Sequence, residues 1–314
     1  MSSISIELTL QQQLINQASE LIDRFSFDKE LKKCTLEYIN YKFNQSINFS
    51  CLTAIHYDIF RAESNEEEKV NIQTIVELVL LASDIMDDLQ DGDSGDNPWA
   101  NIDLGYNLNI IISLLLICLE KIEDIQSANS TIKWIRTKIH QSILEAINGQ
   151  HIDLTNQISS ESDYISMVSL KSGALIKMAC ILGAGNTNKD TLNIIETYSS
   201  YLGIIAQTRN DVNDMINGFM KNDIVTKKRT LPILYYLRHE NPKFQIIKDY
   251  YLGNQSYNEM SDQEISSLHE LLIYGGAVEY CKVLQQLYVY KYKECIYSLN
   301  LDKQAEEQLL NIKI

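Results

Sequence analysis

The chain has 314 residues and a formal net charge of −15 at pH 7, from 27 Lys and Arg against 42 Asp and Glu. This charge argues against a protein that binds nucleic acid or an anionic membrane surface, because both partners need basic patches. The apolar content of 45% is ordinary for a globular protein with a full core.

In chain order, apolar residues recur at three- and four-residue spacing, which predicts helices. The predicted helices cover residues 8–25, 28–43, 70–91, 104–125, 131–158, 164–182, 191–220, 245–251, 262–273 and 278–299. The alternating polarity of strands is nearly absent, and no Ser- or Pro-rich linker interrupts the chain. We therefore predict one all-α domain that covers residues 1–314.

The six cysteines are scattered without a Cys-x-x-Cys pair, which favours free thiols in a reducing compartment. The N-terminal "MSSISIELTLQQQ" has neither the basic start nor the apolar run of a signal peptide. The longest apolar stretch, residues 108–119, is too short to span a bilayer and is interpreted as a buried helix. These features predict a cytoplasmic protein without a transmembrane segment.

A first acidic cluster ends the predicted helix 70–91, where Asp84, Asp87, Asp88 and Asp91 share one face. The helix dipole is negative at this end, and like charges three and four residues apart repel each other. A bound cation would attract these carboxylates and so offset both unfavourable effects. Carboxylate oxygens are ligands that Mg²⁺ prefers. For this cluster alone, a solvated acidic helix end would explain the pattern equally well.

A second cluster, "QTRNDVNDMING" at residues 207–218, ends another mostly apolar helix. The residues that repeat the spacing of the first cluster are Asn210, Asn213, Asp214 and Asn217. Gln207 lies one turn earlier, and Asp211 flanks the same face. Two such helix ends facing each other across a cavity would hold metal ions, which would bridge to a substrate diphosphate. The best cations to clamp that diphosphate are Lys171, which has apolar neighbours, and then Lys228.

These motifs resemble those of the class I isoprenoid synthases, the trans-polyprenyl diphosphate synthase superfamily. "DDLQD" at 87–91 matches the first Asp-rich motif, and "QTRNDVND" at 207–214 is similar to the second, with Asn210 in place of its leading aspartate. The other similar segments are "GQHIDL" at 149–154, "KSGALI" at 171–176 and "DIVTKKRTLPILYYL" at 223–237. The resemblance implies the isoprenoid synthase fold, a helical bundle around a deep apolar cavity, with Mg²⁺ between the two motifs.

The chain departs from this superfamily in its cations. Chain-elongating members carry a Gly-Gly-Lys-Arg-x-Arg-Pro segment before the first motif and an Arg-Arg pair after it, and these cations hold isopentenyl diphosphate. Here residues 43–60 and 70–120 contain no Lys or Arg. Because a buried diphosphate without cations is unstable, we expect an allylic prenyl diphosphate but no isopentenyl diphosphate as substrate.

Within the superfamily, "DDLQDGDSGDNPW" at 87–99 and the Asn-Asp form of the second motif look like the ComQ-type isoprenyl transferases of Bacillus-like bacteria. This resemblance implies transfer of a geranyl or farnesyl group to a tryptophan of a quorum-sensing pheromone precursor peptide. The alternative is a terpene cyclase, although Gly218 stands where the glutamate of the cyclase metal motif would be. A non-catalytic partner subunit ranks last, because this chain keeps both sets of metal ligands.

The resemblance also implies roles for the site residues. Asp87 and Asp91 would bind Mg²⁺ directly, with Asp88 oriented by hydrogen bonds. Asn210 and Asp214 would bind the remaining Mg²⁺, supported by Asp211, and Mn²⁺ is expected to substitute. Lys171, Gln207 and Lys228 would bind the diphosphate. For Asp84, an ion pair with a neighbour and a ligand role stay open, and a homodimer is the expected assembly.

Overall fold

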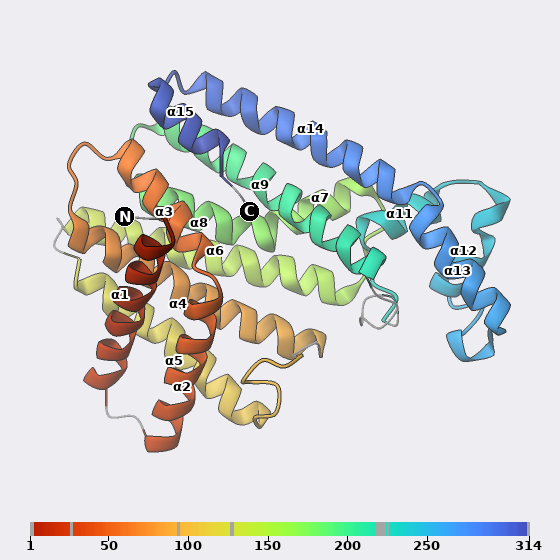
Figure 1. Cartoon of the computed structure of the whole chain (residues 1–314), viewed down its shortest axis with the longest axis horizontal. Coiled ribbons are helices and arrows are strands. Elements are labelled where there is room, and N and C mark those ends of the chain that lie inside the picture. The colour runs from red at the N-terminus through yellow and green to blue at the C-terminus, as the bar shows by residue number, and fades with distance from the viewer. Residues whose placement is uncertain are drawn as a thin grey trace. The chain divides into compact units, whose positions relative to one another are not determined.

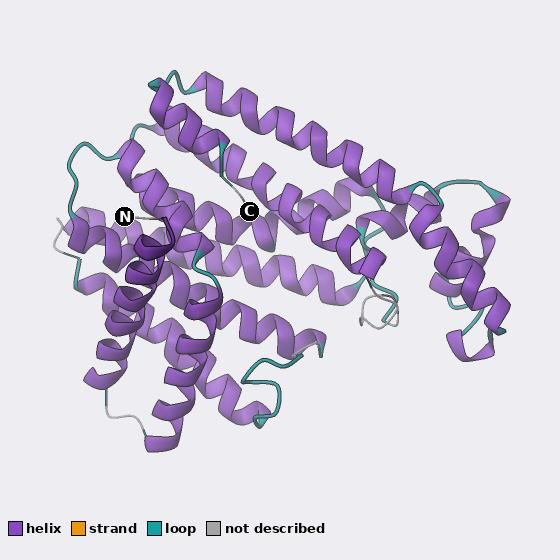
Figure 2. Cartoon of the chain, viewed as in Figure 1, coloured by secondary structure: helices purple, strands orange, loops and turns teal. Residues whose placement is uncertain are grey.

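The computed structural model describes residues 3–25, 28–92, 95–125, 129–217, 224 and 226–312. Within these ranges every regular element is a helix and none is a strand (Figures 1 and 2). The prediction of an all-α fold is therefore confirmed.

Where a helix was predicted, the observed helices begin and end within a few residues of the predicted range. The α-helices are α1 (Ser3–Arg24), α2 (Lys29–Gln45), α3 (Asn48–Phe60), α4 (Glu66–Asp91), α5 (Leu104–Glu123), α6 (Asn129–Thr155), α7 (Glu161–Leu170), α8 (Ser172–Ala184), α9 (Lys189–Asn217), α11 (Leu231–Arg238), α12 (Gln245–Tyr251), α13 (Asp262–Tyr274), α14 (Ala277–Ser298) and α15 (Lys303–Leu310). Two 3₁₀ turns, η1 (Pro242–Phe244) and η2 (Tyr257–Glu259), precede α12 and α13. Three of these helices, α3, α11 and α15, were not predicted.

One predicted helix is two helices in the structure. The segment 164–182 is interrupted at Lys171, whose ψ of −85° leaves the α region, so that α7 ends and α8 begins there. The break lies against α6, because a Cβ added at Gly149 would come within 2.2 Å of the backbone nitrogen of Lys171. Only glycine permits this approach of two backbones.

The chain folds into two compact units. The first comprises residues 1–144, 175–199 and 296–314, and the second comprises residues 145–174 and 200–295. Each unit combines segments that are far apart in the sequence. That a single domain covers 1–314 stays a prediction.

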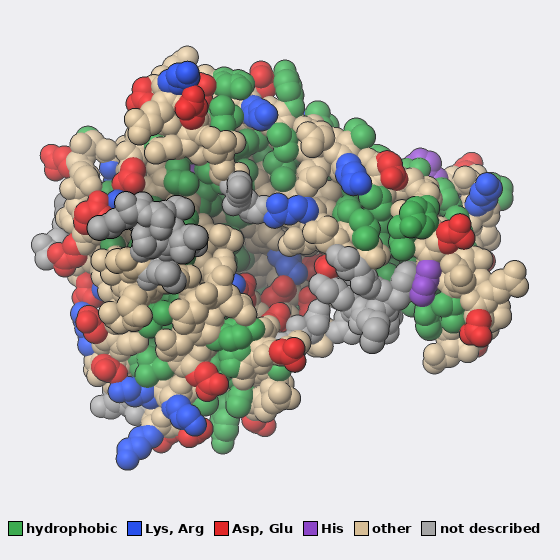
Figure 3. Space-filling model, in the orientation of Figure 1, with side chains coloured by type: hydrophobic (Ala, Val, Ile, Leu, Met, Phe, Trp, Pro, Cys, Tyr) green, Lys and Arg blue, Asp and Glu red, His purple; other side chains and the backbone are tan. Residues whose placement is uncertain are grey.

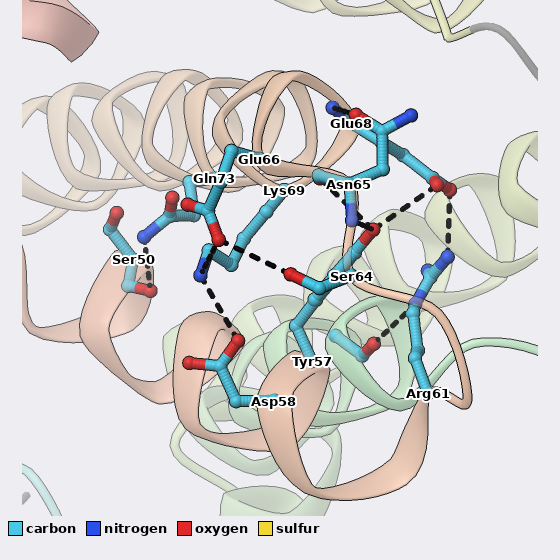
Figure 4. Close-up of polar contacts among 11 residues, drawn as sticks. Ser50, Tyr57, Asp58, Arg61, Ser64, Asn65, Glu66, Glu68, Lys69 and Gln73 are labelled. Carbon is cyan, nitrogen blue, oxygen red and sulfur yellow. Dashed lines mark hydrogen bonds and ion pairs between the residues drawn. The ribbon is translucent and has the colours of Figure 1, made fainter.

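In the first unit, α4 packs against α1, α2, α3 and α5 (Figure 1). Every residue from 71 to 82 of α4 is buried, which explains why this helix is apolar on most faces. Ion pairs at the junction of α3 and α4 join Arg61 to Glu68 at 2.7 Å, and Lys69 to Asp58 at 3.0 Å (Figure 4). These contacts hold the start of the helix whose other end carries the first acidic cluster.

The second unit has a core rich in tyrosine, in which Tyr164, Tyr236 and Tyr250 are at most 2% exposed. Buried hydroxyl groups need partners, and Tyr236 donates to the carbonyl oxygens of Leu271 and Leu272, at 2.6 and 3.0 Å. A second close approach joins α8 to α9, since a Cβ at Gly203 would lie 2.7 Å from the Cα of Gly173. Small residues therefore set the helix spacing around Lys171.

Helix α5 contains the longest apolar stretch and is only partly the buried helix that was expected. Ile110, Ile111 and Leu114 are buried, whereas Ile112 and Leu116 are 56 and 57% exposed. The helix has 20 residues and is long and apolar enough to cross a membrane by length and composition, although the stretch within it was expected to be too short. A core helix of a soluble protein passes the same test. On the face drawn in Figure 3, hydrophobic side chains reach the surface among scattered charges.

Candidate active site

The first motif occupies the last turn of α4, in the first unit. Asp87 and Asp91 lie one turn apart on this helix, and both are half-buried. Gly92 ends the helix directly after Asp91 with a φ of 66°, a left-handed conformation that favours glycine. The two carboxylates thus lie at the end of the helix, where its dipole does not favour anions.

Asp88, between them, is bonded to the loop that follows. Its Oδ2 accepts hydrogen bonds from Nδ2 of Asn97, at 2.7 Å, and from Nε1 of Trp99, at 2.8 Å. Burial raises the pKa of Asp88, and these two hydrogen bonds oppose the rise. Asp88 therefore connects the motif to the loop.

Asp84, one turn earlier, forms an ion pair with Lys42 of α2. Burial lowers the pKa of Lys42, but the attraction of Asp84, with smaller contributions from Glu77 and Asp88, raises it by more. Lys42 thus offsets part of the negative charge along this side of α4.

Glu77 is a buried carboxyl group two turns before Asp84, and it was not among the predicted site residues. It is 1% exposed, and its Oε1 accepts a hydrogen bond of 2.6 Å from the backbone nitrogen of Ser50, in the first turn of α3. Burial raises its pKa to about 7. Because Ile47 provides no side-chain cap for α3, Glu77 supplies an acceptor from another helix.

The second motif lies on α9, within the second unit. Asp211 is 5% exposed, and its two oxygens accept from different donors: Oδ1 from Nε2 of Gln207 at 2.9 Å, and Oδ2 from the hydroxyl of Tyr164 at 2.6 Å. Oε1 of Gln207 accepts from the hydroxyl of Ser172 at 2.9 Å. Each end of the Gln207 amide thus makes one hydrogen bond inside the protein, and a hydrogen bond from its second N–H to the diphosphate stays a prediction.

Asn210 and Asp214 are the predicted metal ligands of this motif. Asn210 is exposed and Asp214 is half-buried, whereas the neighbouring Asp211 is buried. The central aspartates of the two motifs thus share one feature, because Asp88 and Asp211 each accept hydrogen bonds from two side chains.

The two predicted diphosphate-binding lysines lie together in the second unit. Oδ2 of Asp153 accepts a hydrogen bond from Nζ of Lys171 at 2.8 Å and lies 3.4 Å from Nζ of Lys228. Burial alone would raise the pKa of Asp153, but the two ammonium groups lower it by more. Asp153 was not among the predicted site residues, although it ends the "GQHID" segment that carried part of the resemblance.

The donor set suits a hard divalent cation. Asp87, Asp91 and Asp214 offer carboxylates and Asn210 an amide oxygen, which are ligands typical of Mg²⁺. Within the described ranges, no group of three or more His, Cys, Asp or Glu could hold a metal ion by itself. The two motifs belong to different units, so their arrangement around shared metal ions stays a prediction. Gly218 and Asp223 lie outside the described residues.

Comparison with known proteins gives the family. The polyprenyl synthetase family model matches residues 45–268. The tryptophan prenyltransferase ComQ of Bacillus subtilis is 31% identical over 294 residues, which cover 92% of this chain and 93% of that protein. A polyprenyl synthetase from Streptomyces coelicolor has a similar crystal structure, with a TM-score of 0.78 at 16% identity over 98% of this chain and 96% of that chain.

A polyprenyl synthase from Caulobacter crescentus, complexed with calcium and isoprenyl diphosphate, gives a TM-score of 0.77 at 16% identity, over 98% of this chain and 95% of that chain. The two structural matches show the fold and confirm that it is the isoprenoid synthase fold. Divalent metal ions are general in the family. Since the family match covers more than half of its length, the chain belongs to the polyprenyl synthetase family and is a prenyltransferase.

Proposed function

We propose that this prenyltransferase moves a geranyl or farnesyl group from its diphosphate to a tryptophan of a quorum-sensing pheromone precursor peptide. The observation that carries the proposal is the 31% identity to a tryptophan prenyltransferase over nearly the full length of both chains. The absence of Lys and Arg from residues 43–60 and 70–120 supports it, because a neutral indole needs no cationic anchor while a second diphosphate does.

In this proposal the allylic substrate binds through its diphosphate. Lys171 and Lys228 bind the diphosphate oxygens, and Asp153 holds both ammonium groups in place. Asp87, Asp91, Asn210 and Asp214 hold Mg²⁺, with Mn²⁺ as a substitute. When bound, the metal neutralises the charge of the leaving diphosphate.

The reaction breaks the bond between C1 of the prenyl group and the diphosphate oxygen. The electron pair leaves with the diphosphate, and the indole ring of the acceptor donates a pair to form the new bond to C1. The indole then loses one proton, which the diphosphate accepts. Gln207 and Asp211 keep the second motif in place through their bonds to Ser172 and Tyr164.

The test is a mass measurement. The protein is incubated with geranyl or farnesyl diphosphate, Mg²⁺ and a precursor peptide that contains one tryptophan, and the peptide should gain one prenyl unit. A peptide with alanine or phenylalanine in place of that tryptophan should gain none, since a phenyl ring is a much poorer nucleophile. Cyclic hydrocarbons from the diphosphate alone, with no modified peptide, would establish the cyclase alternative instead.

We also propose a cytoplasmic homodimer. The six cysteines are all free thiols in the structure, which supports a reducing compartment. An exposed row on α5, formed by Leu104, Leu108, Ile112 and Leu116 at 46–58% exposure, supports association of two copies. Light scattering should give twice the chain mass, and Ile112→Asp should reduce it to one chain. Cell fractionation should place the protein in the soluble fraction.

A further inference from the structure

The loop after the first motif is anchored by one buried tryptophan. Trp99 is 2% exposed and packs edge-on against two rings of α2, with centroid distances of 5.4 Å to Tyr38 and 5.8 Å to Tyr41. Its carbonyl oxygen accepts from Nδ2 of Asn107, at 3.0 Å, in the first turn of α5. Its side chain and its backbone are therefore both fixed.

Asn97 forms a second connection through the same loop. Its Oδ1 accepts from the hydroxyl of Tyr41 at 2.7 Å, and its Nδ2 donates to Oδ2 of Asp88 at 2.7 Å. Because the tyrosine hydroxyl binds one end of the amide and the carboxylate binds the other, the orientation of the amide is set. The indole N–H of Trp99 donates to the same carboxylate oxygen at 2.8 Å.

We propose that Trp99 and Asn97 are positioning residues, which fix Asp88 so that Asp87 and Asp91 keep the geometry required for the metal. This inference rests on the proposed function, in which Asp87 and Asp91 bind Mg²⁺. Four carboxylates crowd the last two turns of α4, where like charges and the helix dipole both favour fraying. The two hydrogen bonds to the carboxylate of Asp88 oppose this fraying. They also keep the neighbouring ligand residues of the helix in a fixed orientation.

In this role, Asp88 acts through its acceptor oxygen, and its negative charge is not required. An asparagine at this position keeps an oxygen that can accept from both Trp99 and Asn97, whereas alanine keeps none. Asp88→Asn should therefore retain metal binding, and Asp88→Ala should weaken it. A direct metal ligand would behave differently, because removal of its charge would weaken binding in both variants.

The experiment measures Mn²⁺ affinity by electron paramagnetic resonance in the presence of inorganic diphosphate, so that the readout does not depend on turnover. Trp99→Phe, Asn97→Ala and Asp88→Ala should each weaken Mn²⁺ binding by about tenfold or more. Asp88→Asn should stay close to the wild type. The matched control is Trp134→Phe, which changes the only other tryptophan and should have no effect.

Circular dichroism shows whether each variant is folded. If Trp99→Phe does not fold, Asn97→Ala, which leaves the tryptophan in place, tests the same connection. Wild-type affinity in a folded Asn97→Ala variant overturns the proposal, as does an equal loss in Asp88→Asn and Asp88→Ala. Asp87→Asn, run in parallel, tests the proposed metal site itself: unchanged affinity there would refute that site, whatever the positioning variants show.

Discussion

Nζ of Lys171 donates a hydrogen bond of 2.8 Å to Oδ2 of Asp153 in α6, at the point where α7 ends and α8 begins. The same carboxylate oxygen lies 3.4 Å from Nζ of Lys228, so one negative charge lies between two positive ones. The three side chains are 14–18% exposed. One buried carboxylate thus holds together the two ammonium groups that we propose to bind the diphosphate.

Removal of this carboxylate should affect both stability and substrate binding. Asp153→Ala leaves two like charges close together with little water, and we expect a loss of about 2 kcal/mol in the free energy of unfolding. The Michaelis constant for the prenyl diphosphate should rise, because the lysines lose their orientation. Urea unfolding and steady-state kinetics measure the two effects. Glu240→Gln, at an exposed residue of the same unit, is the control and should change neither.

The metal ligands should matter for activity but not for folding. Asp87→Ala or Asp91→Ala should lower turnover by orders of magnitude, and chelation of divalent metal should abolish it. The free energy of unfolding without metal should stay the same or rise slightly, because each variant removes one of several repelling charges from a helix end. Unfolded variants would instead mean that the cluster is structural.

The enzyme should not accept isopentenyl diphosphate as a substrate. Incubation with this compound and an allylic primer should give no longer prenyl diphosphate, as measured by chromatography of the products. Efficient formation of farnesyl or geranylgeranyl diphosphate would contradict the argument from the missing cations.

Glu77 should also make stability depend on pH. Its pKa is raised to about 7 in the folded protein from an ordinary value of 4.5, so the folded state binds the proton more tightly than the unfolded chain. Stability from this group is therefore full below pH 4.5 and falls as the pH rises toward 7. Glu77→Gln keeps an acceptor for the Ser50 N–H and should flatten this slope. Relative to wild type, it should gain on the order of 3 kcal/mol between about pH 4 and about pH 8.

Gly149→Ala tests the contact between α6 and the helix break. In an exposed helix, glycine to alanine stabilises by about 1 kcal/mol. Here the added Cβ would lie 2.2 Å from the backbone nitrogen of Lys171, so we expect a loss of at least about 2 kcal/mol and reduced activity. Asn148→Ala, at the exposed neighbouring position of α6, is the control for helix propensity. A stabilised Gly149→Ala protein would show that the two helices can separate at no cost.

The sequence by itself determined most of the helices and the residues on their polar ends. The periodicity of α4 and α9 depends only on residues a few positions apart, so it placed Asp87 with Asp91, and Asn210 with Asp214, without knowledge of the fold. The sequence signal for a helix start was incomplete for α3, which has no side-chain cap of its own and whose Ser50 N–H donates to Glu77 of another helix. For α15 such a signal was present, since the side chain of Asp302 caps its first turn.

Only the tertiary structure decided which partners these residues have. Asp153 meets Lys228, Asp211 meets Tyr164, and Lys42 meets Asp84, and each pair joins different helices or loops. Residue spacing does not predict such contacts, because they arise when separate helices pack together. The break at Lys171 has the same origin. The sequence 164–182 is periodic enough for one helix, but in the structure this segment forms two helices, and Gly149 of α6 lies against the backbone at the break.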